Sequence, residues 1–208
     1  MNLPTFLVPK IYRLPDSKYN RNISVVKGFG EPTLVSDDLI ESGHLLTHIW
    51  KTGITRLLPK EFSPQSILLL GLGGGSNTIL VRKMYPQAKI TVIEIDPQMV
   101  DIAYKFFGLK KHKNLEIIVD DAEYYVKNLG SKRFDLILVD CFVGKFIPAS
   151  LQQINFIKSL YSHSRFTLIN RIWGNEHHLE TVFFLRKISK HFLYLKTHTQ
   201  TNIIVSLI

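Results

Sequence analysis

The sequence predicts an α/β protein with a mixed, mostly parallel sheet of about seven strands, and three observations support this expectation. Short apolar runs alternate with helical patterns from residue 66 onward. A glycine-rich turn, GLGGG at 71–75, directly follows the first run. Near the end of the chain, the short turn TQTN joins two apolar runs, which predicts an antiparallel pair because parallel strands need longer crossovers.

The parallel part of the sheet is predicted from five apolar runs, at 66–70, 89–95, 115–119, 134–139 and 166–172. Helical patterns follow these runs, at 76–85, 97–107, 122–128, 151–159 and 176–189. Repeated strand–helix–strand units predict parallel strands joined by right-handed crossovers. The runs 191–198 and 202–208 form the antiparallel end, so the last strand is expected to oppose the others.

The first 60 residues show a different pattern. NISVVKGFG and EPTLVSDD alternate around a Gly-Phe-Gly-Glu-Pro turn signal, which predicts a small β-hairpin. In HLLTHIWKTGITRLL, apolar residues recur near helical spacing, so we expect a helix at 44–58. The segment PKEFSP then links to the alternating region. We therefore predict an N-terminal hairpin and helix at 1–60 and a sheet domain at 61–208.

Composition restricts the class of protein. With 208 residues, 45% of them hydrophobic, the chain can bury a core as one domain. Its single cysteine, Cys141, excludes an internal disulfide framework and a multi-cysteine zinc site, so we expect a reducing, cytoplasmic compartment and no metal. No apolar run reaches the roughly 18 residues of a spanning helix and no signal peptide is evident, so no membrane partner is expected.

The chain is basic, with a formal net charge of +9 and a basic cluster, LKKHKN, at 109–114. A positive field attracts phosphates and other anions, so nucleic acid stays open as a partner. Aromatic residues do not interleave with the cluster as a single-strand binder would need, and a solvated loop is the favoured interpretation. The sequence also leaves a homodimer open.

Gly71, Gly73 and Gly75 give the spacing G-x-G-x-G at a strand-to-helix turn. Such a turn brings backbone N–H groups and a helix N-terminus to the carboxyl edge of a parallel sheet, where nucleotides bind. A dinucleotide fingerprint would need Gly or Ala at the position of Ser76, and a Walker lysine is missing, so NAD and FAD are disfavoured. A merely structural tight turn is the alternative.

Carboxylates lie at or just after the ends of the next three predicted strands. Glu94 lies about 20 residues beyond the glycines, where a carboxylate can accept hydrogen bonds from both ribose hydroxyls. Asp121 either accepts from an adenine amine or caps the helix that begins at Ala122, and adenine recognition is slightly favoured. Asp140 lies beside the glycine turn, where a carboxylate facing a cleft is more often functional than structural. Together they predict an adenosine pocket without phosphate chemistry.

Four segments between 67 and 151 carry a family resemblance: ILLLGLGGGSNT, ITVIEIDPQMVDIAYKFFGL, DDAEYYV and FDLILVDCFVG. They resemble the spermidine synthase-like branch of class I S-adenosylmethionine-dependent methyltransferases. The resemblance implies a Rossmann-like fold, with S-adenosylmethionine or decarboxylated S-adenosylmethionine as cofactor. It assigns the methionine moiety to Gly71, Gly73 and Gly75, the ribose to Glu94, the adenine to Asp121 and Ala122, and the catalytic edge to Asp140.

The chain departs from true spermidine synthases where the amine would bind. Their Asp-x-x-Asp motif is DCFV at 140–143 in this chain, so the second acid is replaced by Val143. Their first helix usually supplies a Tyr, a Gln or His, and a Glu toward the diamine, whereas this chain has SGH at 42–44. Because burying an unpaired ammonium is costly, these changes argue against putrescine as the acceptor.

We therefore expect an S-adenosylmethionine-dependent transferase, more specifically a methyltransferase with a small-molecule acceptor that the sequence does not identify. Asp140 would orient or deprotonate this acceptor. Further acceptor-side candidates are Asn170, Arg171 and His44, while Cys141 is expected to pack rather than react. Two alternatives stay open: an aminopropyltransferase that uses decarboxylated S-adenosylmethionine, and a non-catalytic relative that binds a nucleoside or nucleic acid.

Overall fold

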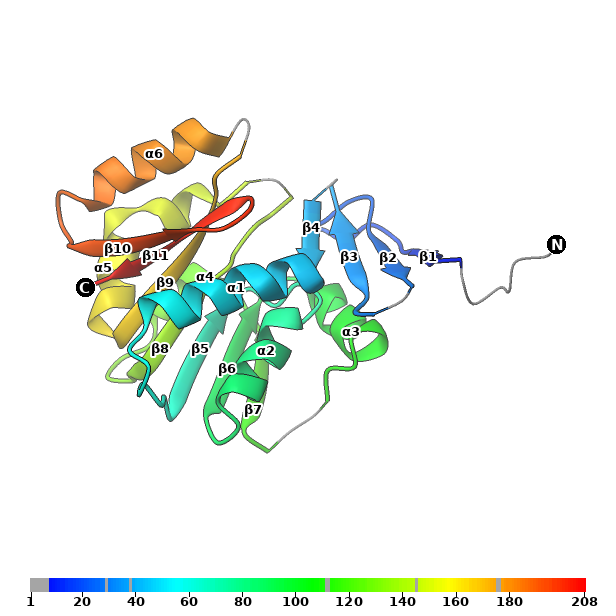
Figure 1. Ribbon diagram of the computed structural model, residues 1–208, viewed down its shortest axis with the longest axis horizontal. Coiled ribbons are helices and arrows are strands. Elements are labelled where there is room, and N and C mark those ends of the chain that lie inside the picture. Colours follow the sequence, from blue (N-terminus) through cyan, green and yellow to red (C-terminus); the bar gives the residue numbers. More distant parts are fainter. Residues whose placement is uncertain (1–7, 29, 38, 111–112, 145, 175–176) are drawn as a thin grey trace.

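The computed structural model shows two sheets, a small N-terminal one and a larger one between layers of helices (Figure 1). It describes residues 8–208 except 29, 38, 111–112, 145 and 175–176. Parts of three sequence features therefore lie outside the described residues. They are residues 29 and 38 in the predicted hairpin, residues 111–112 in the basic cluster, and residue 176 at the predicted start of the last helix.

The N-terminal sheet has four antiparallel strands, β1 (Lys10–Arg13), β2 (Ser24–Lys27), β3 (Thr33–Ser36) and β4 (Leu39–Ser42). The expected hairpin is the pair β2–β3. The sequence did not predict β1 or β4. All four residues of β1 are exposed, and β4 carries a glutamate and a serine, so neither strand shows the apolar alternation that marks a strand in a sequence.

The larger sheet has seven strands in the order β10-β11-β9-β8-β5-β6-β7. Strands β5 to β9 are parallel, and β11 is antiparallel to both of its neighbours, β9 and β10. This arrangement confirms the predicted mixed sheet with its reversed last strand. The strand bounds are β5 (Ser66–Leu70), β6 (Lys89–Glu94), β7 (Leu115–Val119), β8 (Phe134–Val139), β9 (Ser164–Ile172), β10 (Tyr194–His198) and β11 (Asn202–Leu207).

Three helices cover each face of this sheet. One face carries α1 (His44–Leu57), α2 (Ser76–Met84) and α3 (Pro97–Phe106). The other face carries α4 (Ala122–Lys127), α5 (Ile154–Ser162) and α6 (His177–Ile188). Among the described helices, none combines the length and the apolar character needed to cross a membrane.

The helix predicted at 151–159 begins later in the structure, at Ile154. A short 3-10 turn, η2 (Ala149–Gln152), precedes it and starts directly after Pro148. Gln153 has an extended backbone, with ψ of 142°, so it separates the 3-10 turn from the helix. The sequence pattern merged these two elements because Leu151 and the apolar residues of α5 follow one another at near-helical spacing.

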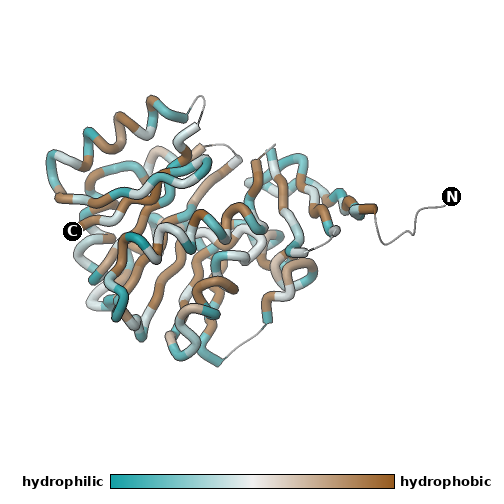
Figure 2. The backbone as a smooth tube through the Cα atoms, in the orientation of Figure 1, coloured by the Kyte–Doolittle hydropathy of each residue, from teal (hydrophilic) through white to brown (hydrophobic). Residues whose placement is uncertain are grey.

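The strands of the parallel sheet are buried on both sides, which explains their almost uninterrupted apolar runs. In β5, Leu68 and Leu70 pack under α4–α6, whereas Ile67 and Leu69 pack under α1–α3. Each is at most 2% exposed, and burying one such side chain contributes about 1.5–3 kcal/mol. Figure 2 shows the hydrophobic residues along these central strands.

The N-terminal sheet packs on α3 through a separate cluster, which includes Val25, Leu34 and Met99.

Candidate functional site

The glycine turn connects β5 to α2 and requires a left-handed backbone. Gly71, Gly73 and Gly75 have φ values of 93°, 52° and 87°, which favour glycine. A Cβ at Gly71 would overlap the carbonyl oxygen of Asp140, so the turn runs directly beside the end of β8. Gly71 and Gly73 line a pocket at this edge. Gly75 does not line it, because it is the residue before α2 and packs against Ala103 of α3.

Glu94 holds the glycine turn in place. Its Oε2 accepts hydrogen bonds from the backbone N–H of Leu72 at 2.8 Å and of Gly73 at 3.3 Å, and its Oε1 accepts from Asp96 at 2.9 Å. Burial raises the pKa of Glu94, although these three bonds act in the opposite direction. A carboxylate has about four acceptor positions, so backbone groups use three of them and about one is left toward the pocket.

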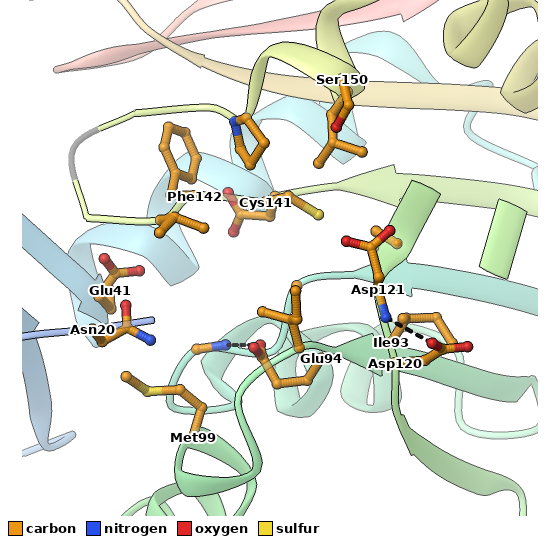
Figure 3. A pocket seen from close by; sticks show the side chains of 18 residues that line it. Asn20, Glu41, Ile93, Glu94, Met99, Asp120, Asp121, Cys141, Phe142 and Ser150 are labelled. Carbon is orange, nitrogen blue, oxygen red and sulfur yellow. Dashed lines mark hydrogen bonds between the residues drawn. The ribbon is translucent and has the colours of Figure 1, made fainter. Parts of the chain in front are cut away.

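The pocket lies at the carboxyl ends of the parallel strands and is open to solvent. Figure 3 shows it between the segment that carries Asn20 and Glu41 and the strand ends that carry Glu94 and Asp121. Among its described lining residues there is no lysine, arginine or histidine. The pocket is therefore acidic although the whole chain is basic, and its carboxylates are Glu41, Glu94, Asp120, Asp121 and Asp140.

Asp121 caps α4, as one of the two sequence interpretations proposed. Its Oδ1 accepts from the backbone N–H of Tyr124 at 2.9 Å, while its own N–H donates to Asp120 at 2.8 Å. Its Oδ2 has no hydrogen-bond partner among the residues that the structure describes. Asp121 and the buried Ala122 both line the pocket, so capping uses one oxygen and does not remove Asp121 from the site.

Asp140 lies between two pockets and is held by three N–H donors. Its Oδ2 accepts from Trp50 Nε1 at 2.9 Å and Asn77 Nδ2 at 2.6 Å, and its Oδ1 accepts from Asn170 Nδ2 at 2.8 Å. Asn170 is itself fixed, because its Oδ1 accepts from Asn202 Nδ2 at 2.9 Å. Burial raises the pKa of Asp140, and the three donors counteract this by stabilising its charge. The carboxylate is thus fixed in orientation.

A second pocket lies on the other side of Asp140. It shares Glu41, Gly73, Asp140 and Phe142 with the first pocket. The rest of its described lining is mainly apolar, with a few uncharged polar residues: Leu39, Ile40, Leu45, Leu46, Ile49, Leu72, Ile172, Asn170, Thr201 and Asn202. The two pockets therefore differ in character and meet at a pair of carboxyl groups.

Glu41 was not identified from the sequence, and it comes from β4 of the N-terminal sheet. Burial raises its pKa to about 8, and the nearby carboxylates of Asp140, Glu94 and Asp37 add to the effect. The hydroxyl of Ser36 donates to Glu41 Oε1 at 3.1 Å and partly offsets it. The available sequence signal was an acid directly after Ile40, in a short segment before the first helix.

The remaining acceptor-side candidates lie elsewhere. Arg171 points away from Asn170, because successive residues of a strand face opposite sides of the sheet. Its guanidinium forms an ion pair with Glu180 at 3.4 Å and lies over the ring of Phe184. His44 is exposed at the start of α1 and lines neither pocket. Cys141 lines the first pocket, but burial raises the pKa of its thiol well above the usual value. No metal-binding cluster is found among the described residues.

The sheet order, the glycine turn and the acidic pocket define a Rossmann-like protein of the kind that binds nucleosides at the carboxyl edge of its sheet. Residues 45–172 match the family model described as "Spermine/spermidine synthase domain", and the chain belongs to this family. Its fold is the spermidine synthase-like fold of S-adenosylmethionine-dependent transferases. The family uses S-adenosylmethionine or its decarboxylated form.

Curated relatives include two kinds of transferase. A polyamine aminopropyltransferase of Vibrio vulnificus (strain CMCP6) is 36% identical over 112 residues, which are 51% of this chain and 38% of the relative. An eEF1A lysine and N-terminal methyltransferase of Mus musculus is 25% identical over 146 residues, 64% of this chain and 21% of the relative. The chain thus matches well under half the length of either relative.

A solved structure shares the fold. The crystal structure of human methyltransferase-like protein 13 in complex with SAH has a TM-score of 0.68 to this chain and 21% sequence identity. The match covers 79% of this chain and 82% of that one. At this identity the likeness concerns the fold alone.

Proposed function

We propose that this chain binds S-adenosylmethionine in the first pocket and transfers its methyl group to an acceptor in the second. The observation that carries the proposal is the meeting of the two pockets at Asp140 and Glu41. The bound sulfonium supplies an electrophilic methyl carbon, so the protein mainly has to align the acceptor with it. Asp140, fixed by three donors, is placed to orient the acceptor.

The lining of the first pocket fits a cationic nucleoside better than a phosphate-bearing one. Its described residues include five acidic side chains and no lysine, arginine or histidine. A dinucleotide or nucleoside triphosphate would bring negative charge next to these groups, whereas a sulfonium brings positive charge. Within this pocket we propose Gly71 and Gly73 for the methionine part of the ligand and Glu94 for the ribose.

For the adenine we propose Asp121 through its Oδ2, to which no described residue donates a hydrogen bond, with Ala122 beside it. Both line the pocket, and Asp121 lies across it from Asn20 and Glu41 (Figure 3). An amine hydrogen of adenine could reach Oδ2 without disturbing the helix cap on Oδ1. We propose that Gly75 acts indirectly, by fixing the start of α2 against α3.

The second pocket favours methyl transfer over the aminopropyl reaction. A diamine acceptor carries a charge at each end and needs carboxylates along its length, because an unpaired buried ammonium is costly. Among the described lining residues, only Glu41 and Asp140 are acidic, and both lie at the junction with the first pocket. An acceptor with one nucleophilic group on a partly apolar body suits this pocket better.

Aminopropyl transfer remains the second candidate, and one observation favours it. The first pocket is acidic at the junction as well as beside Glu94. This also suits decarboxylated S-adenosylmethionine, which lacks the negative carboxylate and so has a more positive net charge. The polyamine aminopropyltransferase among the relatives agrees with this alternative.

Calorimetric titration with S-adenosylmethionine, its decarboxylated form and S-adenosylhomocysteine tests the proposal. We expect S-adenosylmethionine and S-adenosylhomocysteine to bind and the decarboxylated form to bind more weakly. Mass spectrometry of products from a panel of monoamines and diamines then identifies the transferred group as methyl or aminopropyl. Tighter binding of the decarboxylated form with aminopropyl products would replace the proposal by the second candidate, and no binding of any ligand would leave the non-catalytic alternative.

A further inference from the structure

The two carboxyl groups at the junction of the pockets have opposite environments. Asp140 accepts three hydrogen bonds from N–H donors. Glu41 accepts one, from the neutral hydroxyl of Ser36, and its Oε2 has no hydrogen-bond partner among the described residues. Since N–H donors stabilise a carboxylate, the charge is favoured on Asp140 and disfavoured on Glu41.

Within the described part of the chain, the charged groups that act on Glu41 are all negative. They are Asp37 from the turn before β4, Glu94 from the end of β6 and Asp140 from the end of β8. No described residue that lines either pocket is a lysine, arginine or histidine. Burial together with these neighbours raises the pKa of Glu41 to about 8. At neutral pH the carboxyl group is therefore mainly protonated until a cation enters the site.

We propose that Glu41 is the proton-exchanging group of this site: it ionises when the sulfonium of S-adenosylmethionine binds and then takes the proton that an amine acceptor loses. This inference rests on the proposed function. Pairs of carboxyl groups whose environments separate their proton affinities are a common way to divide acid–base and orienting roles. Here Glu41 would exchange protons, and Asp140 would orient the acceptor.

The proposed steps balance in atoms and charge. Glu41 first releases its proton to solvent as the positive sulfonium binds beside it. Its carboxylate then accepts a proton from the ammonium of the acceptor, which leaves a nitrogen lone pair. The nitrogen forms a bond to the methyl carbon while the carbon–sulfur bond breaks, and that electron pair stays on sulfur. The product amine carries the positive charge, sulfur becomes a neutral thioether, and Glu41 is protonated as it was at the start.

This cycle can be tested without knowing the acceptor, because S-adenosylmethionine and S-adenosylhomocysteine differ in the charge on sulfur. Calorimetric titrations in buffers of different ionisation enthalpy count the protons released on binding. At pH 7 we expect the wild type to release most of one proton with S-adenosylmethionine and much less with S-adenosylhomocysteine. Glu41→Gln should lose this release while it binds S-adenosylhomocysteine within about threefold of the wild type.

The affinity for S-adenosylmethionine should depend on pH for the same reason. For the wild type, the affinity for S-adenosylmethionine should rise by up to about tenfold per pH unit from pH 6 to pH 8 and then level off. Comparison with Glu41→Gln removes any contribution from the ligand's own amino group, because that group is present in both titrations. Glu116→Gln is the matched control, since Glu116 is exposed on β7 and lies outside both pockets.

Ser36→Ala gives a second, independent variant in case Glu41→Gln does not fold. It removes the hydrogen bond from Ser36 that favours ionised Glu41, so the pKa of Glu41 should rise further. The pH at which the affinity levels off should therefore move upward. If both ligands bind but proton release persists in Glu41→Gln, or is equal for the two ligands, the role of Glu41 is refuted and the cofactor site stands. If neither ligand binds to the wild type, the proposed function fails and this inference fails with it.

Discussion

Glu41→Gln should stabilise the folded protein, and the gain should grow as the pH rises. The pKa of Glu41 is raised by burial from 4.5 to about 8. Between these values the folded protein keeps a proton that the unfolded chain has lost. Since the folded state binds more protons, the stability of the wild type falls with rising pH across this window. A glutamine at this position does not titrate, so the variant escapes that loss.

The size of the effect follows from the shift in pKa. Each pH unit inside the window changes the free energy of unfolding by up to about 1.4 kcal/mol. Between pH 5 and pH 8 the full shift would change the free energy of unfolding by about 3.5 kcal/mol. Because Glu41 is partly exposed, solvent screening should reduce this to about 2–3 kcal/mol. Glutamine has nearly the same volume and can still accept the hydrogen bond from Ser36, so packing should change little.

Urea unfolding of the wild type, Glu41→Gln and Glu116→Gln at pH 5, 6, 7 and 8 measures this effect. The quantity of interest is the difference in free energy of unfolding between variant and wild type at each pH, because the other titrating groups cancel in it. For Glu41→Gln the difference should increase toward pH 8, and for the exposed Glu116 it should stay near zero. A difference that is constant with pH would show that Glu41 has an ordinary pKa and would refute the reasoning.

Three further predictions concern the same edge of the sheet. Glu94→Gln leaves one acceptor oxygen for three backbone N–H groups, so it should lower the free energy of unfolding in urea by about 1.5–3 kcal/mol. It should also weaken nucleoside binding. If stability and affinity were both unchanged, Glu94 would neither hold the turn nor bind the ligand. Gly73→Ala combines a positive φ with a Cβ only 2.7 Å from the Glu41 carbonyl oxygen. It should therefore destabilise more than Gly108→Ala, where the φ is also positive but nothing lies within 4 Å, and only Gly73→Ala should weaken ligand binding. Asp140→Asn should keep cofactor affinity within about threefold, or about 0.7 kcal/mol, and lower turnover by about 10²–10⁴ once an acceptor is known; parental turnover would show that Asp140 has no catalytic role.

The sequence predicted the central sheet well because its strands are buried on both faces. An apolar run such as SILLL leaves few alternatives to a strand when a glycine turn and a helical pattern follow it. The two strands that the sequence did not reveal, β1 and β4, have no such signal. Strand β1 is exposed throughout, and β4 has the polar residues Glu41 and Ser42 after its two apolar residues. Their positions depend on pairing with β2 and β3.

The site was predictable as far as its residues follow parallel strands. Glu94, Asp121 and Asp140 could be placed together because the carboxyl ends of parallel strands meet at one edge. Glu41 and Asn202 could not, since one comes from an antiparallel N-terminal strand and the other from the reversed last strand. Nothing local in either segment shows that it reaches this site. Strand β4 contacts the glycine turn only when the two sheets pack, and Asn202 reaches Asn170 only when β11 pairs with β9.

The glycine turn itself depends on the N-terminal sheet as much as on β6. The N–H of Gly74 donates to the hydroxyl of Ser42 at 2.6 Å, and the hydroxyl of Ser76 donates to Glu31 at 2.6 Å. Ser42 directly follows Glu41 in the chain, so the strand that carries the proposed proton-exchanging carboxyl also braces the turn proposed for the cofactor. The domain division at residue 60 stays a prediction, and these bonds cross it. Binding in the first pocket and the charge state at the junction should therefore be coupled through a single strand, β4.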